Sequence, residues 1–511
     1  MTHWTSGYVA EIGYTYGYYN ELNPNRTNFA VLNAGYAPPS SGVHCELGFG
    51  QGLSVNVHSA ASGSSWYAND FNPSQAAFAQ SLASASGADA HLTDEAFADF
   101  CSRSDLPDFD SIGLHGIWSW ISDENRSVIV DFIRRKLKVG GALYISYNTQ
   151  PGWAAFAPMR HLMTEHASVM GSTGKGVVSK IDGALEFAQK LIDTNPLYAR
   201  ANPSVADRLK KVATQDRHYL AHEYFNKDWH PMYFATMSQW LSPAKIDFAC
   251  SSHYLDHIDA LNLTAEQQNL VKEIPDVTFK ESVRDFMVNQ QFRRDYWIKG
   301  ARKLSTVEQA ELIKKHRLIL TSAREEVSLK ITGALGEANL SEAIYAPVLE
   351  LLSDHKIRSI ADIADHVKKK DVSFPQVVQV AMVLIGSGHM ASVQTDEQIN
   401  KAKQSTLKLN LALVDKARFS TDITFLASPI TGGGFAVNRF QQLFLLAMQE
   451  GKKNPQEWAQ ATWTVLASQN QRLLKDGKPI ETADGNLEEL TRQAKEFADK
   501  RVPILKALHV L

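Results

Sequence analysis

The sequence predicts an α/β protein in which an N-terminal parallel β-sheet is covered by helices and followed by mostly α-helical middle and C-terminal domains. Three observations lead to this fold class. Strand and helix patterns alternate between residues 42 and 148, helical patterns dominate from 153 to about 240, and strand patterns nearly disappear after about residue 275. Alternation of strands and helices is typical of parallel sheets, because the chain crosses one face of the sheet between successive strands.

The alternating segment contains short apolar runs bounded by turn residues. Helical periodicity separates these runs, most clearly from Ser74 to Ala85 and from Asp123 to Leu137. A turn at Gly140 and Gly141 then leads from the second of these helices into another strand. We therefore predict strands at residues 43–48, 64–70, 109–115 and 141–148, with a further strand just before residue 94.

A returning strand is predicted at residues 245–255, after the long helical stretch, so the helical stretch is expected to be an insertion into the sheet domain. The prediction is then a sheet domain over residues 1–275 with an insertion at about 153–240, a helical middle domain over 276–395, and a mostly helical C-terminal domain over 396–511.

The middle domain contains three short helical patterns followed by the strand-like HMASV, an order typical of a winged helix-turn-helix. The helical patterns cover residues 341–354, 359–370 and 374–388. A helix that reads DNA needs Arg, Lys, Asn or Gln on its surface, and the third pattern offers only Gln376 and Gln379 among valines. We therefore expect a buried module that faces protein.

Composition and charge exclude several classes of function. The formal net charge is −3 and we find no sizeable basic patch, so nucleic acid is not an expected partner. The three cysteines lie far apart without a CxxC pair, which argues against zinc and suits a reducing compartment. The sequence has no 18-residue apolar stretch and no signal-peptide pattern at its start, so we expect a cytoplasmic protein without membrane insertion.

The stretch HCELGFGQGLSV places an acid and three glycines between a predicted strand and a predicted helix. Glu46 ends the strand, and Gly48, Gly50 and Gly52 follow at two-residue spacing. Glycines at this place let bare backbone approach a ligand at the carboxyl edge of a parallel sheet. The dinucleotide fingerprint needs a glycine where Leu53 stands. The spacing favours a cofactor without a pyrophosphate, commonly S-adenosylmethionine, and a purely structural turn is an equal alternative.

Acidic residues follow the next two predicted strands. Asp70 ends the second strand, where a carboxylate can accept hydrogen bonds from both hydroxyls of a ribose. The alternative is a helix cap, a role that suits Asn72 better. One helix later, TDEAFADF places Asp94 or Glu95 where an adenine amino group would lie and Phe97 against its ring, with ordinary capping equally open.

In this order, the elements resemble the Rossmann-like fold of class I S-adenosylmethionine-dependent methyltransferases over roughly residues 1–260. Four further stretches resemble bacterial methyltransferases that carry a methyltransferase regulatory domain, a group that includes the rickettsial protein-lysine methyltransferases. They are FDSIGLHGIWSWISDENR, LKVGGALYISYNTQPGW, YLAHEYFNKDWHPMYF and NQQFRRDYWIKGARKLS. The glycine-rich FLASPITGGGFAVNRFQQLFLLA resembles their C-terminal part. The resemblance implies a catalytic domain and later domains that shape a surface for a protein substrate.

The predicted contacts to S-adenosylmethionine combine these motifs with the N-terminal tyrosines. Tyr14, Tyr16 and Tyr19 are expected either to fold over the cofactor as a lid or to form a docked arm. His222 and Glu223 lack the spacing of a metal motif and are expected to pack a helix against that lid. The residues predicted to bind the cofactor are Tyr16, Tyr19, Glu46, Gly48, Gly50, Asp70, Phe71, Glu95, Ala96, Phe97 and His115.

Methyl transfer from a sulfonium needs positioning and desolvation more than covalent help, so aromatic and polar residues after the fourth and fifth strands are the catalytic candidates. If the acceptor is lysine, Trp118 can hold the ammonium by a cation–π contact, and Tyr147 and Asn148 can orient the neutral amine. For Trp118, Trp120 and Trp153, a place in the core or in a lid is the alternative.

The sequence thus predicts an S-adenosylmethionine-dependent N-methyltransferase whose acceptor is a lysine side chain of a protein, with a homodimer left open. One alternative is methylation of a small molecule or surface saccharide, because HGIW stands where many amine methyltransferases of this fold carry an acid or Asn, two prolines and an aromatic residue. Another is a regulator that only senses the cofactor.

Overall fold

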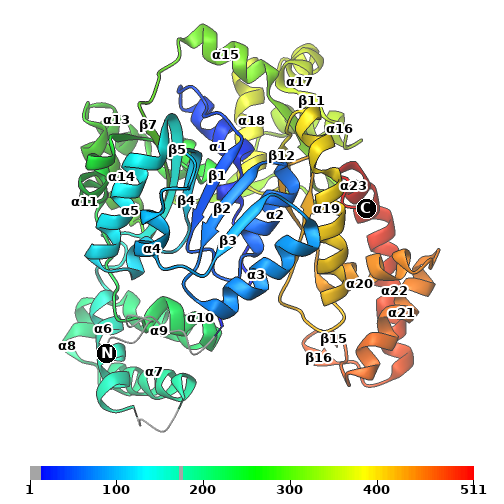
Figure 1. Cartoon of the computed structure of the whole chain (residues 1–511), viewed down its shortest axis with the longest axis horizontal. Coiled ribbons are helices and arrows are strands. Elements are labelled where there is room, and N and C mark those ends of the chain that lie inside the picture. The colour runs from blue at the N-terminus through cyan, green and yellow to red at the C-terminus, as the bar shows by residue number, and fades with distance from the viewer. Residues whose placement is uncertain (1–12, 172–175) are drawn as a thin grey trace.

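The computed structural model describes residues 13–171 and 176–511 and is built around one seven-stranded sheet (Figure 1). The strand order is β3-β2-β1-β4-β5-β7-β6. All neighbouring strands pair in parallel except β7, which is antiparallel to both β5 and β6. The strands are β1 (Val43–Leu47), β2 (Ser65–Asn69), β3 (Ala90–Thr93), β4 (Phe109–Leu114), β5 (Leu137–Asn148), β6 (Ile246–Ser251) and β7 (Phe292–Lys299).

Helices connect the first five strands, as the alternating sequence pattern predicts. β1 and β4 are buried along almost their whole length, which explains why they read as continuous apolar runs. The first turn of α5 is capped by Ser122, whose side chain accepts a hydrogen bond from Asn125 N. These connecting helices are α2 (Leu53–Ser62), α3 (Pro73–Ser86), α4 (Phe97–Ser102) and α5 (Asp123–Lys136), and α1 (Pro24–Asn33) precedes β1.

The expectation that strands nearly disappear after residue 275 is wrong for β7. This strand lies between β5 and β6, so the boundary predicted after residue 275 would cut through the sheet. Arg293, Arg294 and Asp295 interrupt its apolar pattern, although Arg293 and Asp295 are buried in the structure. Arg293 and Asp295 pair with each other, and Glu281, Asp285 and Tyr147 from other elements complete the network, which a local sequence pattern does not reveal.

The predicted helical insertion forms a separate layer below and to the left of the sheet in Figure 1 and has its own hydrophobic cluster. It contains α6 (Ala157–Val169), α7 (Val177–Asp193), α8 (Leu197–Ala201), α9 (Ser204–Ala213) and α10 (Arg217–Tyr224). The chain then returns to the sheet and leads to β7 through α11 (Phe234–Leu241), α12 (Asp259–Asn262), α13 (Ala265–Lys272) and α14 (Val277–Val288).

The middle segment has the predicted winged-helix-like order. A three-stranded sheet, β11-β8-β12, packs with α16 to α18, and α18 is buried over most of its length, as expected for a module that faces protein. The elements are α15 (Thr306–Lys315), β8 (Arg317–Leu320), β9 (Lys330–Gly333), β10 (Gly336–Asn339), α16 (Glu342–Leu352), β11 (Arg358–Ser359), α17 (Ile360–Val367), α18 (Phe374–Gly386) and β12 (Met390–Ser392).

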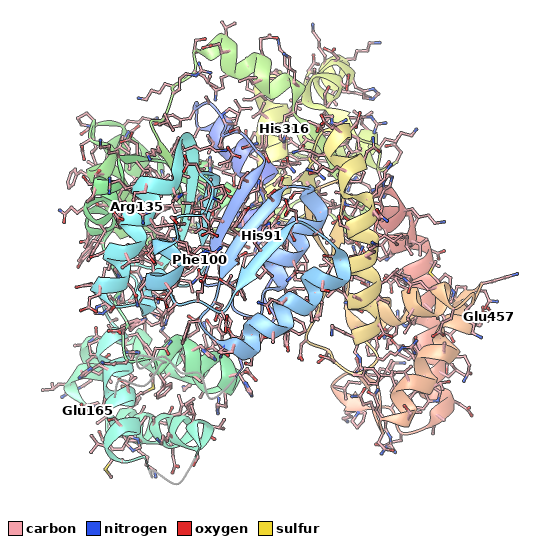
Figure 2. All side chains as sticks on the ribbon, viewed as in Figure 1. His91, Phe100, Arg135, Glu165, His316 and Glu457 are labelled. Carbon is pink, nitrogen blue, oxygen red and sulfur yellow. The ribbon has the colours of Figure 1, made fainter. Side chains whose placement is uncertain are left out.

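The C-terminal segment packs its long first helix, α19, against α2 and α3 of the sheet domain. Figure 2 shows Glu165 on the insertion and Glu457 on the C-terminal helices, at opposite sides of the sheet. Within the described ranges, no helix is long and apolar enough to cross a membrane. The elements are α19 (Asp396–Lys416), β13 (Phe425–Ser428), β14 (Gly433–Ala436), α20 (Arg439–Gln449), α21 (Pro455–Ser468), β15 (Leu474–Lys475), β16 (Lys478–Pro479), α22 (Ala483–Glu496) and α23 (Val502–Ala507).

Candidate functional site

The loop between β1 and α2 is built from glycines in the left-handed region of backbone conformation. Gly48, Gly50 and Gly52 have φ angles of 71°, 59° and 70°. A Cβ added at Gly48 would lie 2.6 Å from Ile117 Cδ1, and one at Gly52 would lie 2.4 Å from Ala79 Cβ. Gly52 therefore allows α2 to approach α3 closely, while Gly48 and Gly50 leave bare backbone at the carboxyl edge of the sheet.

Two buried carboxyl groups, Glu46 and Asp70, flank this loop. Asp70 accepts hydrogen bonds from Gly50 N at 2.8 Å and from Asn72 N at 3.0 Å, which ties the loop to the end of β2. Asn72 accepts a hydrogen bond from Ser74 N and so caps α3, in agreement with the sequence analysis, which judged the cap role better suited to Asn72 than to Asp70. Burial raises the pKa of Asp70 to about 6, against the opposing effect of the two N–H donors.

Glu46 is the more isolated of the two acids. Its side chain is only 2% exposed, and its Oε2 has no hydrogen-bond partner among the residues that the structure describes. Burial, and then the neighbouring charge of Asp70, raises the pKa of Glu46 to about 8, so the group is largely protonated at neutral pH. An unpaired buried carboxyl oxygen is costly, and a ligand with a hydrogen-bonding group would satisfy it.

The N-terminal arm covers the loop with two tyrosines. Tyr14 lies over Gly50, and its hydroxyl donates a hydrogen bond to Glu223 Oε1 at 3.0 Å. His222 meets the Tyr14 ring edge-on with the ring centroids 5.0 Å apart, so α10 packs against the arm as predicted. Tyr19 stacks on His115 with the ring centroids 3.5 Å apart. The arm thus joins the loops after β1 and β4 to the helical insertion.

Tyr16 takes a different position from the one predicted. Its ring packs edge-on against Phe78 of α3 at 5.0 Å, next to the hydrophobic cluster of the C-terminal segment. The nearby Tyr18 hydroxyl accepts a hydrogen bond from Gly434 N at 2.7 Å. Tyr16 and Tyr18 therefore fix the arm to the rest of the molecule, while Tyr14 and Tyr19, on the same segment, face the glycine loop and the end of β4.

His115 follows β4 and is held as a neutral imidazole. Its Nδ1 lies 2.8 Å from the Tyr144 hydroxyl, and its ring lies between Tyr19 and Tyr144. Burial lowers the pKa of His115 to about 4. Gly116 N donates to Ser146 Oγ at 2.8 Å, which fixes the loop after β4 to β5. This part of the sheet edge is therefore aromatic, with a neutral imidazole near the Glu21–Arg294 ion pair.

The segment after β3 supplies one ring to the loop. Phe97 begins α4, and its Cζ lies 3.6 Å from the position that a Cβ on Gly48 would occupy. Glu95 is half-buried and pairs with Arg103 at 3.2 Å, and Ala96 is exposed at the start of α4. Phe71 is half-buried at the end of β2. The predicted adenine side thus has an aromatic residue against the glycine loop and an acid already paired with arginine.

Comparison with known proteins identifies the family. A family model described as a predicted methyltransferase regulatory domain matches residues 216–299, from the N-cap of α10 to the last residue of β7. An uncharacterized protein of Synechocystis, sll1526, is 38% identical over 99% of both chains. The chain belongs to the family of sll1526. RP789, an uncharacterized protein of Rickettsia prowazekii, is 24% identical over 77% of this chain and 74% of its own length.

The solved structures give the fold of this family. PKMT2 from Rickettsia typhi, in complex with AdoHcy, covers 96% of this chain and 99% of its own with a TM-score of 0.68 at 16% identity. The likeness confirms the fold predicted from the sequence, that of class I methyltransferases, and the family model matches the predicted methyltransferase regulatory segment. The matched regulatory segment supplies β6 and β7, so in this family member it completes the methyltransferase sheet.

The residues at the sheet edge of this methyltransferase fit S-adenosylmethionine. Glu46 has an unsatisfied oxygen that can pair with an amino group, and Asp70 keeps lone pairs for ribose hydroxyls beside the two that it already uses. Gly48 and Gly50 expose their backbone without a Cβ, and the side chains of Ile117, Phe97 and Tyr14 pack directly beside them. Phe97 offers a flat apolar surface beside that backbone.

Two of the three predicted catalytic residues lie in the core. Trp118 is completely buried, and its Nε1 donates to Met232 Sδ at 3.4 Å. Tyr147 is equally buried and donates to Asp295 Oδ2 at 2.9 Å. Successive residues of a strand point to opposite faces, so Tyr147 faces the apolar cluster beneath α5, while Tyr144 and Ser146 face His115 and its loop. The predicted contact of Trp118 and Tyr147 with an acceptor is therefore wrong.

Asn148 stays at the sheet edge. Its Oδ1 accepts from Trp153 Nε1 at 3.1 Å, and its Nδ2 has no partner among the described residues although the side chain is buried. Sequence reasoning assigned no site role to Tyr144, Glu21 or Phe292. Glu21 pairs with Arg294 of β7 at 2.7 Å, across 273 residues of sequence. The local sequence signal for the Glu21–Arg294 pair was the charge of Arg294, which lies in the region after residue 275 that was predicted to be helical.

Proposed function

We propose that this methyltransferase uses S-adenosylmethionine to methylate the side-chain nitrogen of lysine residues in a protein. The observation that carries the proposal is the aromatic edge after β4, where neutral His115 stacks on Tyr19 and is hydrogen-bonded to Tyr144. Aromatic surfaces attract sulfonium and ammonium cations, whereas a protonated imidazole would repel them.

The cofactor contacts follow from the chemistry of the residues present. Glu46 would hold the amino group of the methionine part, and Asp70 would hold the ribose hydroxyls. Backbone at Gly48 and Gly50 would face the cofactor directly, with Phe97 against the adenine and His115 near the sulfur end. Tyr14 and Tyr19 would close over it and exclude water. Phe71, Glu95 and Ala96 line the approach in this proposal, whereas Tyr16 anchors the arm against Phe78.

When bound, S-adenosylmethionine supplies a methyl group on a sulfonium, so that an amine lone pair forms the new N–C bond in line as the S–C pair returns to sulfur. The chain positions the two reactants and accepts the proton that the lysine ammonium must lose first. Glu223 is suited to that proton, because burial raises its pKa to about 7 and Tyr14 holds it against the arm. The Asn148 Nδ2, which has no partner among the described residues, would orient a substrate.

Lysine as the acceptor is supported by the resemblance of the motifs to rickettsial protein-lysine methyltransferases and by the full-length likeness of the fold to PKMT2 of Rickettsia typhi. The proposed cofactor contacts of Glu46, Gly48, Gly50 and Asp70, which we call the cradle, would be the same for a small-molecule or saccharide acceptor. They would also be the same in a regulator that only binds the cofactor. The acceptor therefore has to be identified by labelling.

The test is incubation of the purified full-length protein with methyl-labelled S-adenosylmethionine and lysate from a bacterium that lacks the gene. Labelled bands are then examined by gel autoradiography and mass spectrometry. Label on lysines of one or a few proteins is the expected result, and Asp70→Ala should remove it together with most calorimetric cofactor binding. Label only in small molecules or saccharide contradicts the lysine acceptor. Cofactor binding without any transfer indicates the regulator.

A further inference from the structure

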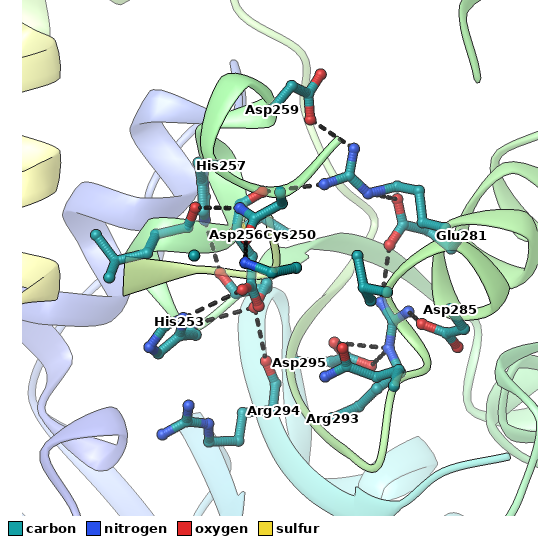
Figure 3. A pocket seen from close by; sticks show the side chains of 18 of the residues that line it. Cys250, His253, Asp256, His257, Asp259, Glu281, Asp285, Arg293, Arg294 and Asp295 are labelled. Atoms are coloured by element: carbon teal, nitrogen blue, oxygen red, sulfur yellow. Dashed lines mark hydrogen bonds and ion pairs between the residues drawn. The ribbon is translucent and has the colours of Figure 1, made fainter. Parts of the chain in front are cut away.

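A second cavity lies at the far end of the sheet, where β6 ends and β7 begins. It has a volume of about 450 Å³ and is closed by η4 (Tyr254–His257), α12, α14 and the β9–β10 hairpin. Figure 3 shows its charged side chains from close by. We call this cavity the acidic pocket. It shares no lining residue with the glycine loop or with the segments after β2, β3 and β4.

The acidic pocket contains more carboxylates than its arginines can neutralise. Arg293 pairs with three of them, Glu281 at 2.8 Å, Asp285 at 2.7 Å and Asp295 at 2.9 Å, as the dashed lines of Figure 3 show. Arg284 pairs with Asp259 at 2.6 Å. The remaining wall arginine, Arg294, is bound to Glu21, and Asp256 is paired only with His253 and a serine. Four of the five wall carboxylates thus share two arginines, and the fifth, Asp256, pairs with His253.

Asp285 shows directly that the charge is not satisfied. Its side chain is 5% exposed, Oδ1 is bound by Arg293, and Oδ2 has no hydrogen-bond partner within the described part of the chain. Burial raises the pKa of Asp285 to about 7 even though Arg293 opposes the shift. A cation in the pocket would supply the missing partner and favour the ionised carboxylate.

The geometry of the wall favours an organic cation. Among the described residues, no group of three or more His, Cys, Asp or Glu side chains is arranged to hold a metal ion. The carboxylates are instead spread along the wall between η4, α14 and β7, and several are already bridged by guanidinium groups. Lysine and arginine side chains place their charge at the end of a long apolar stem and so can reach such a carboxylate in a narrow cavity.

The position of the acidic pocket relates it to the proposed acceptor site. β7 pairs with β5, with Arg294 opposite Ser146, and Ser146 holds the loop that follows β4. Phe292, at the start of β7, meets the His115 ring with the centroids 6.4 Å apart. Neighbouring strands lie about 4.8 Å apart, so β4 and β7 are about 10 Å apart at this edge. An extended peptide covers that distance in about three residues. Arg293 lies opposite Tyr147, on the other face from Ser146 and Arg294, so the substrate side chain would reach Asp285 across the end of β7.

We propose that the acidic pocket binds a basic side chain of the protein substrate, a few residues away in sequence from the lysine that is methylated. This inference rests on the proposed function for the identity of the substrate. The binding itself does not require methyl transfer. The pocket would give the enzyme a preference for lysines that have a second basic residue near them, and it would orient the substrate across the end of β5.

The test compares the binding of two fluorescein-labelled peptides to the full-length protein by anisotropy. One is a decapeptide with two lysines three positions apart, and the other has glutamine in place of the second lysine. The wild type is expected to bind the first peptide roughly tenfold more tightly, as an added charged hydrogen bond predicts. Asp285→Asn should remove most of that difference, because it keeps the shape and the contact with Arg293 but loses the charge.

Asp247→Asn is the matched control, since Asp247 is an exposed acid on β6 and does not line the acidic pocket. It should leave the difference between the peptides unchanged. Equal effects of Asp247→Asn and Asp285→Asn would overturn the inference, because they would indicate only general attraction between opposite charges. If Asp285→Asn does not fold by circular dichroism, Asp259→Asn, at a more exposed pocket carboxylate, replaces it with the same expectation.

Failure of this inference is distinguishable from failure of the proposed function. Labelled lysines in the lysate, together with peptide binding that is independent of Asp285, would overturn only the inference about the acidic pocket. A loss of peptide discrimination in Asp285→Asn, without labelled lysines in any protein, would support a binding site for a basic side chain and contradict the lysine acceptor.

Discussion

The two ends of the sheet differ in what they present at the same edge. At β1 and β2 the chain presents backbone, because glycines occupy the loop and both of the acids beside it are buried. At β6 and β7 it presents charged side chains, held in place by one arginine that binds three carboxylates. A cofactor of constant shape suits a fixed backbone cradle, whereas a protein substrate is recognised through side chains. The difference indicates that the two ends should respond differently to substitution.

The largest effect is expected at the charged end. Arg293→Met leaves Glu281, Asp285 and Asp295 without their common partner and should lower the free energy of unfolding by about 3–5 kcal/mol, as for other broken buried ion pairs. Arg284→Met is the matched control, with a loss of about 1 kcal/mol or less, because its partner Asp259 is 46% exposed. Urea unfolding measures both, and equal losses would show that burial does not distinguish these arginines.

At the cradle, the pH dependence of stability tests the neutral state of Glu46. The pKa of Glu46 is about 8 in the folded chain and near 4.5 in the unfolded chain. Both states are protonated below pH 4.5, and as the pH rises toward 8 the unfolded chain ionises first, so folding loses stability over this window. Glu46→Gln cannot ionise and should lose about 3 kcal/mol less than the wild type between pH 5 and 7.5.

Urea unfolding at the two pH values measures that difference. Glu124→Gln, at an exposed position in the first turn of α5, is the control and should follow the wild type. A Glu46→Gln variant with the same decline as the wild type would mean that the Glu46 carboxyl already ionises at its ordinary pKa in the folded protein.

Gly48→Ala should separate crowding at the cradle from simple backbone strain. Gly48 and Gly87 have similar φ angles of 71° and 63°, but a Cβ meets Ile117 at Gly48 and nothing within 4 Å at Gly87. Both substitutions should cost about 1–2 kcal/mol of stability. Only Gly48→Ala should also weaken S-adenosylmethionine binding, by about tenfold or 1.4 kcal/mol in a calorimetric titration. Equal affinities of the two variants for S-adenosylmethionine would show that Gly48 does not contact the cofactor.

The smallest effect is expected at Tyr147, which lies between the two ends. Tyr147→Phe loses a buried hydrogen bond to Asp295 and should lower the free energy of unfolding by about 1 kcal/mol. Turnover should change by less than about twofold, because the hydroxyl faces the charged network and not the glycine loop. A tenfold fall in turnover at unchanged stability would indicate that Tyr147 acts at the reacting centre.

How much could be predicted from the sequence depends on how local each feature is. The glycine spacing, Glu46 at the end of a strand and Asp70 at the end of the next predicted the cradle, since all three follow from a single strand–loop–helix unit. Strand β7 was missed because charged residues masked its apolar pattern. The sequence analysis chose Tyr147 and not Tyr144, and only the packing of β5 showed that Tyr144 is the tyrosine that faces His115.

The sequence by itself determined the fold class, the glycine loop and its acids, because these depend on backbone conformation and on neighbours within a few tens of residues. Only the tertiary structure decided which side chains meet at the site. Tyr14 binds Glu223 across 209 residues, and Glu21 binds Arg294 across 273. Such contacts form when whole layers pack together, so the energy that stabilises a buried charge or an aromatic stack comes from partners that no local pattern specifies.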